Sequence, residues 1–151
     1  MIKFLSLGIL GTLWHFLYNF TGQNYFVGLF APVSESTWEH MKLAFFPGII
    51  IMLIFVPKKY TAQWMVSILT ATWLIPVIFY TYSGILGFTL MWADILTYFL
   101  SIAFAIILLK HIQKTSISAG ATIIIRLLVL LQFVSFLYFS YNPGTLGIFA
   151  A

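Results

Sequence analysis

The sequence predicts an all-α polytopic membrane protein, in which residues 1–151 form a single domain of five transmembrane helices. Only 7% of the 151 residues are charged, against about 25% in an ordinary soluble domain, and 62% are hydrophobic. The apolar residues also form continuous runs, each long enough for the roughly 20 helical residues that cross a hydrocarbon core. The sequence has too few polar residues to cover the surface of a soluble fold. The lipid bilayer is therefore the expected partner, and nucleic acid is excluded.

The spans follow the apolar runs in chain order. Their expected boundaries are about residues 2–20, 36–56, 62–82, 88–111 and 119–140. The first run begins like a signal peptide, but no small-x-small cleavage pattern follows, so we interpret it as an uncleaved span. The second has a polar start in which Ser36-Thr37-Trp38-Glu39 matches a capping box, with Ser36 capping the helix and Glu39 capping back.

The last four spans are separated by short loops at residues 57–61, 83–87 and 112–118. Pro47 in the second span and Pro76 in the third are sites where a helix can kink. Transmembrane strands are not expected, because the runs do not alternate and are too long for barrel strands.

The lysines predict the orientation. Lys3 precedes the first span, Lys58 and Lys59 lie between the second and third, and Lys110 and Lys114 lie between the fourth and fifth. The other two loops and the C-terminal tail contain no Lys or Arg. Because Lys and Arg concentrate in cytoplasmic loops, the N-terminus is expected inside and the C-terminus outside, in a multi-pass plasma-membrane protein.

With this orientation, most of the other ionisable side chains fall at the outer end. His15 ends the first span, Glu35, Glu39 and His40 begin the second, and Asp94 lies in the outer part of the fourth. Charges near the hydrocarbon are costly and normally face the bundle interior or water. Three acids from two helices at one level therefore predict one shared site.

Helical spacing supports this prediction. Gly8, Gly11, His15 and Asn19 recur every three or four residues, and this places them on one small-and-polar stripe. Such a stripe lets another helix approach closely and turns His15 inward. The full set of candidate ligand-binding residues is Glu35, Glu39, His40, His15, Asp94, Asn19, Tyr80, Tyr82, Trp38 and Lys42.

Carboxylates and imidazoles together are typical ligands of a divalent metal such as zinc. The candidates for that role are Glu39, His15, Asp94 and His40, although their spacing matches no H-E-x-x-H motif. Structural interpretations stay open beside this one. Glu35 and Glu39 are also placed to act as helix caps, and an isolated His15 is commonly a packed, hydrogen-bonded residue.

The leading hypothesis is an outward-facing pocket that binds a cation, either a metal ion or a cationic small ligand, for transport or sensing. A five-span transporter would be small and is expected to form a homodimer. A second hypothesis is a membrane-embedded enzyme that acts on a lipid or isoprenoid and uses the same carboxylates as acid/base groups or metal ligands. A third is a structural or immunity subunit in which the cluster is a buried hydrogen-bond network.

Residues 32–43, which read P-V-S-E-S-T-W-E-H-M-K-L, resemble the signature P-V-[NS]-E-S-x-W-E-H-x-K-L of an uncharacterised bacterial family of small multi-span membrane proteins, a domain of unknown function. Residues 80–87 and Asp94 are also similar to that family. The resemblance implies a bacterial membrane protein with a similar spacing of spans. It implies no activity.

Overall fold

The computed structural model of the chain describes residues 2–150, with side chains from Ser6 onward. The described part is all-α. Its helices are α1 (Ile2–His15), α2 (Leu17–Phe20), α3 (Tyr25–Gly28), α4 (Thr37–Phe55), α5 (Thr61–Leu86), α6 (Met91–Ile112) and α7 (Ala119–Phe139), with short 3-10 turns η1 (Lys58–Tyr60) and η2 (Gly147–Phe149). Within residues 2–150 there is no strand.

Four helices, α4 to α7, are long and apolar enough to cross a membrane. Their bounds agree with the four later expected spans to within a few residues, and the largest difference is that α5 continues to Leu86. Gly87 then ends α5 in the left-handed conformation, at φ 75°, and donates its N–H to Ser83 O. The first expected span, 2–20, is divided at Phe16 into α1 and α2, and the 14 residues of α1 fall short of the roughly 20 that a span needs.

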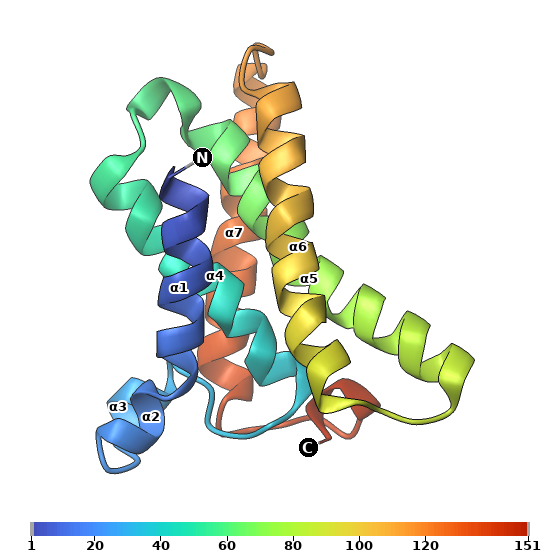
Figure 1. Cartoon of the computed structure of the whole chain (residues 1–151). Helices are drawn as coiled ribbons and strands as arrows, with labels where there is room; N and C mark the ends of the chain where they lie inside the picture. Colours follow the sequence, from blue (N-terminus) through green and yellow to red (C-terminus); the bar gives the residue numbers. More distant parts are fainter. Residues whose placement is uncertain (1, 151) are drawn as a thin grey trace.

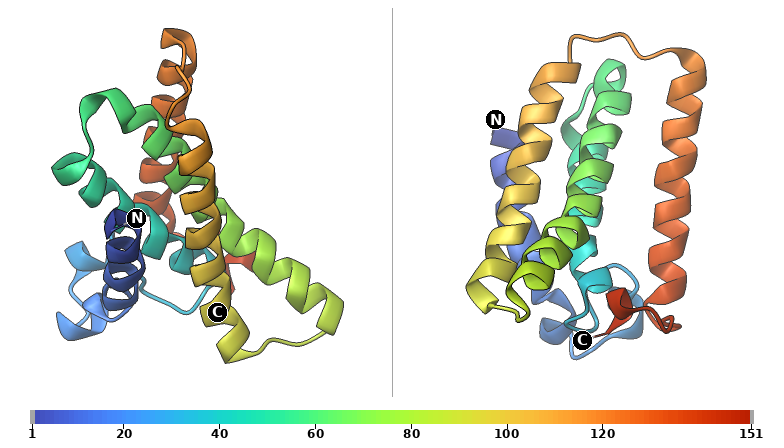
Figure 2. Two further views of the ribbon diagram at one scale, coloured as in Figure 1. Left: turned by 45° about the horizontal axis from the view of Figure 1, so that its top comes forward. Right: turned by 90° about the vertical axis from the view of Figure 1, so that its right-hand side faces the viewer.

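The long helices run in alternating directions (Figure 1). The start of α1, the α4–α5 connection and the α6–α7 connection lie at one end of the bundle, and both views in Figure 2 agree. That end carries Lys58 and Lys59 in η1, Lys110 at the end of α6 and Lys114 in the connection that follows. The opposite end contains α2, α3, the α5–α6 connection and the C-terminal segment with η2.

Helix α4 lies at the centre of the fold. It packs against α5 and α1, while an aromatic cluster joins it to α7, for example through Phe46 and Phe136 with ring centroids 5.7 Å apart. Helix α7 exposes most of its Leu and Ile side chains, including Leu127 and Leu131. In a bilayer such a face is solvated by lipid chains, which explains why so apolar a surface needs no polar cover.

The small-residue stripe of α1 allows three helices to meet at Gly11. A Cβ there would lie 2.5 Å from the Leu43 carbonyl oxygen of α4 and would also collide with the Tyr98 hydroxyl of α6. That hydroxyl donates to Leu7 O at 2.9 Å. The Leu43 carbonyl is the one that Pro47, which has no N–H, leaves without its usual helical donor. The close approach of α1 therefore covers the break that Pro47 makes in the ladder of α4.

Candidate functional site

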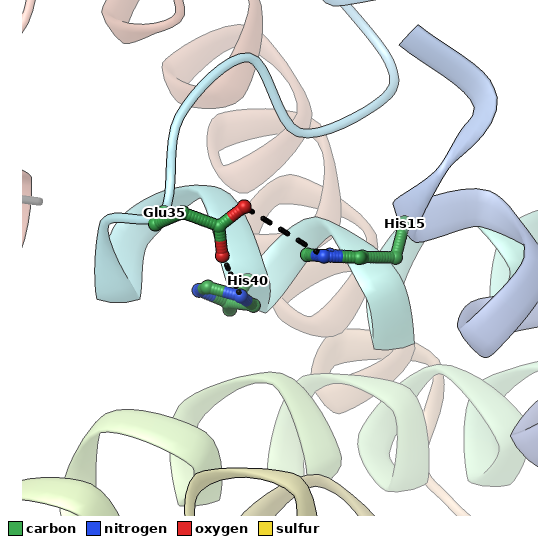
Figure 3. A group of neighbouring side chains, drawn as sticks. All are labelled: His15, Glu35 and His40. Carbon is green, nitrogen blue, oxygen red and sulfur yellow. Dashed lines mark ion pairs between the residues drawn. The ribbon is translucent and has the colours of Figure 1, made fainter. Parts of the chain in front are cut away.

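Glu35 brings together two histidines from different helices (Figure 3). The three residues lie where α1 ends and α4 begins, at the end of the bundle away from the lysines (Figure 1). Glu35 Oε2 lies 3.3 Å from His40 Nε2, and Glu35 Oε1 lies 3.7 Å from His15 Nε2. The two imidazole rings stack with centroids 5.3 Å apart and planes 18° apart. One ligand atom from each of the three residues lies within 4.8 Å of the others, which is close enough for a single metal ion.

The start of α4 explains how Glu35 and His40 meet. Ser36 is the N-cap residue, and its hydroxyl accepts from Glu39 N at 3.3 Å. Glu35 therefore lies before the helix, in a bend of the chain that leads into it. His40 is one turn into the helix, and its Nδ1 lies 2.9 Å from Ser36 O.

The His40–Ser36 contact determines where the proton of the ring sits. A carbonyl oxygen only accepts hydrogen bonds, so Nδ1 must carry the N–H. In the neutral ring Nε2 is then a bare lone pair, and it faces the Glu35 carboxylate at 3.3 Å. Two acceptors at this distance repel each other. The arrangement is favourable when a proton or a metal ion lies between the two atoms.

The cluster lies on the wall of a cavity of about 770 Å³ between α1, α4, α5, α6 and the C-terminal segment. Much of the remaining wall is apolar. Besides the cluster, Tyr80 and Asp94 line it from α5 and α6. The sequence predicted none of the apolar lining residues, because Leu43, Ile75, Phe79, Ile95 and Phe99 have the composition of any helix face.

The sequence model of a family of unknown function, DUF6512, matches residues 1–151. The chain belongs to this family. No curated protein and no solved structure matches the chain. Family membership therefore covers residues 1–151 but assigns no activity. The chemistry of this DUF6512 protein has to be inferred from its own residues.

In this DUF6512 chain Glu39 turns away from Glu35. Its Oε2 accepts from Val33 N at 2.8 Å and from Lys42 Nζ at 2.7 Å, and the residue is only 3% exposed. Half of the predicted capping box is therefore wrong: Ser36 caps Glu39 N, but Glu39 does not cap back, and Ser36 N donates to Ser34 Oγ instead. The predicted metal ligand Glu39 is part of a buried ion pair.

Lys42 is fully buried, and four acceptors surround its Nζ. Besides Glu39 Oε2 these are Gly28 O at 3.0 Å, Ala31 O at 3.4 Å and Ser140 Oγ at 2.7 Å. A buried ammonium needs such partners because its desolvation is otherwise very costly. Lys42 and Glu39 together hold the backbone of residues 28–33, and so they fix the segment that leads into Glu35.

Asp94 has a separate partner. The Tyr82 hydroxyl forms a hydrogen bond to its Oδ1, and Leu90 N reaches the same hydroxyl at 3.5 Å. Asp94 lies in the first turn of α6, where the helix dipole favours a carboxylate. Among the described residues it shares the cavity with Glu35 but is not in the group of His15, Glu35 and His40.

The other predicted site residues lie outside the cavity. Trp38 is 7% exposed and packs on Phe136 and Phe149 in the aromatic cluster. Asn19 is exposed on α2, and neither it nor Tyr82 lines the cavity wall. The structure thus divides the predicted shared site into a His15–Glu35–His40 cluster, a Glu39–Lys42 ion pair and a Tyr82–Asp94 pair. Ser140, which is 98 positions from Lys42, has no signal in the sequence that marks it as a partner.

Proposed function

We propose that this DUF6512 protein is a plasma-membrane protein that binds a divalent transition-metal ion such as zinc at His15, Glu35 and His40, for transport or sensing. The observation that supports it most is the approach of His40 Nε2 to a carboxylate oxygen at 3.3 Å while Nδ1 of the same ring faces Ser36 O. A metal ion at that position converts the repulsion into two coordinate bonds, and the open side of Glu35, whose side chain is 72% exposed, gives the ion a route from water.

The ligand set matches zinc chemistry. Two imidazoles and one carboxylate bind zinc in sites that keep a fourth position open for water or another ligand. The hydrogen bond from His40 Nδ1 to Ser36 O is the usual outer partner of a ligating histidine, because it orients the ring and raises its basicity. His15 lacks such a partner among the described residues, since its buried Nδ1 has none. His15 is therefore the most weakly oriented ligand of the three.

The proposed membrane arrangement has five spans, with α1 and α2 together forming the first, and with the metal cluster outside. Alternating helix directions support it. Helix α1 contacts α4 and α6 but runs in the opposite direction to them, which is the direction of α5 and α7 (Figure 1). The lysines of η1 and of the α6–α7 connection lie at the opposite end from the cluster. By the preference of Lys for cytoplasmic loops, that end is inside.

The test is elemental analysis of the purified protein in detergent, after chelation and equilibration with zinc. We expect about one zinc ion per chain in the wild type, as the three-ligand site predicts, and loss of most of it in Glu35→Gln and His40→Ala. His111→Ala is the matched control, because His111 is an exposed histidine at the other end of the bundle. A wild type without bound zinc, or a Glu35→Gln variant that keeps it, would refute the proposal and leave an imidazolium–carboxylate ion pair as the explanation of the geometry.

A further inference from the structure

We infer that the cavity beside the cluster binds a single-chain amphiphile with an anionic headgroup, whose headgroup completes the coordination of the metal and whose chain lies against the apolar wall. The part of the inference that concerns the headgroup rests on the proposed function. The first support for the inference is size. A cavity of about 770 Å³ is in the range of pockets that enclose a small organic molecule, and it is far larger than an ion with a few waters requires.

The chemistry of the wall supports an organic occupant rather than a hydrated ion. The wall from α5 and α6 carries the polar side chains of Tyr80 and Asp94, but most of the exposed surface of the cavity is apolar and includes Phe79 and Phe99. A hydrated cation gains nothing against such side chains, because they cannot replace its water ligands. A hydrocarbon chain is stabilised there by burial of its apolar surface.

The route to the cavity supports a lipid source. Ile95 and Phe99 line the cavity and are still 55% and 46% exposed at the surface of α6. On the same wall, Phe16 of the α1–α2 break is 46% exposed and Met91 at the start of α6 is 80% exposed. The cavity wall is thus continuous with an apolar surface that, in the proposed arrangement, faces lipid. A hydrocarbon chain can enter this cavity sideways from the bilayer without crossing water.

The charge of the site selects the headgroup. A divalent ion with one carboxylate and two neutral imidazoles carries a net positive charge, and its fourth position favours an anionic oxygen. Asp94 in the same cavity is held by the Tyr82 hydroxyl and by the dipole of α6, which reduce its repulsion of an anion. A carboxylate and a phosphate monoester both offer the required oxygen.

The experiment measures binding to the zinc-loaded protein by native mass spectrometry. The probes are oleic acid for a carboxylate head, lysophosphatidic acid for a phosphate head, and oleyl alcohol as the uncharged control. We expect at least one anionic probe to bind one per chain and about tenfold more tightly than the alcohol, because only the anion gains a bond to the metal. Which of the two binds more tightly identifies the headgroup.

Two variants separate binding of the amphiphile's hydrocarbon chain from binding of the metal. Ile95→Trp narrows the cavity from an exposed position, and Leu96→Trp is its matched control, because Leu96 is 45% exposed on the same helix and does not line the cavity. We expect Ile95→Trp to lose amphiphile binding while keeping its zinc, and Leu96→Trp to keep both. Equal binding of acid, phosphate and alcohol by the zinc-loaded protein, or wild-type binding by Ile95→Trp, overturns the inference and leaves the metal site intact. Absence of zinc in the wild type refutes the proposed function, and with it the headgroup contact.

Discussion

Lys42 Nζ donates to Glu39 Oε2 across 2.7 Å inside the protein, where both residues are almost completely buried. The same two side chains hold Ala31 O and Val33 N, in the segment that leads into Glu35. An ion pair that begins at the residue before His40 thus supports the His15–Glu35–His40 cluster. Glu39 Oε2 and the Lys42 ammonium are already bonded within the protein, so we assign the pair no contact with the ligand.

We predict that breaking this pair destabilises the protein strongly. Glu39→Gln or Lys42→Met leaves one buried group without its counter-charge, a change that typically costs about 3–5 kcal/mol. The double variant should recover part of the loss, because no charge is left unpaired. Unfolding in a denaturing detergent series measures the effect. Lys114→Met, at an exposed lysine, is the control, and single variants as stable as this control would contradict the assigned role.

We predict that zinc affinity rises with pH. Only a neutral imidazole binds a metal, so protons compete with zinc at His15 and His40, and each ion bound displaces up to about two protons in acidic solution. Titration of zinc binding between acidic and mildly alkaline pH measures this dependence. Affinity that does not change with pH would show that the histidines are not ligands.

The contact at Gly11 predicts a steric effect. Gly11→Ala places a methyl group 2.5 Å from Leu43 O and against the Tyr98 hydroxyl, so α1 must move away from α4 and α6. Overpacking of this kind costs about 1–3 kcal/mol. Gly8→Ala is the matched control on the same stripe, because its Cβ would meet only Phe99 at an ordinary 3.7 Å. The prediction fails if the two variants unfold at the same denaturant concentration.

The Tyr82–Asp94 pair predicts a local effect. Tyr82→Phe removes a partly buried hydrogen bond and should cost about 0.5–1.5 kcal/mol, with zinc content unchanged. Asp94→Asn should also keep its zinc, since Asp94 is outside the cluster of described ligands. Elemental analysis of both variants decides this. A lower zinc content in either variant would show that Asp94 contributes to the metal site. The single shared site predicted from the sequence would then be correct.

The absence of cysteine makes the orientation easy to test. Gln113→Cys lies in the α6–α7 connection, and Asn142→Cys lies after α7, both at exposed positions. In intact cells a membrane-impermeant maleimide should label Cys at 142 and reach Cys at 113 only after permeabilisation. The reverse pattern would invert the proposed topology, and labelling of both sites in intact cells would contradict an odd number of crossings between them.

The sequence by itself determined that the chain suits a lipid environment and where its long helices lie. In lipid, long apolar runs with so few charges satisfy their backbone as helices. The helix expected at 119–140, for example, is observed at Ala119–Phe139. The sequence did not reveal the end of α1 at His15, because hydropathy continues through Phe16 to Phe20 without a breaking residue.

Only the tertiary structure decided which polar side chains meet. Glu35 and Glu39 have the same chemistry four positions apart, yet the N-cap at Ser36 leaves one outside the helix beside two imidazoles and the other inside it beside an ammonium. That ammonium is held by Ser140 at the far end of the chain. Local spacing cannot encode such a partner, because the free energy that selects it comes from burying a charge among acceptors that only the complete fold assembles.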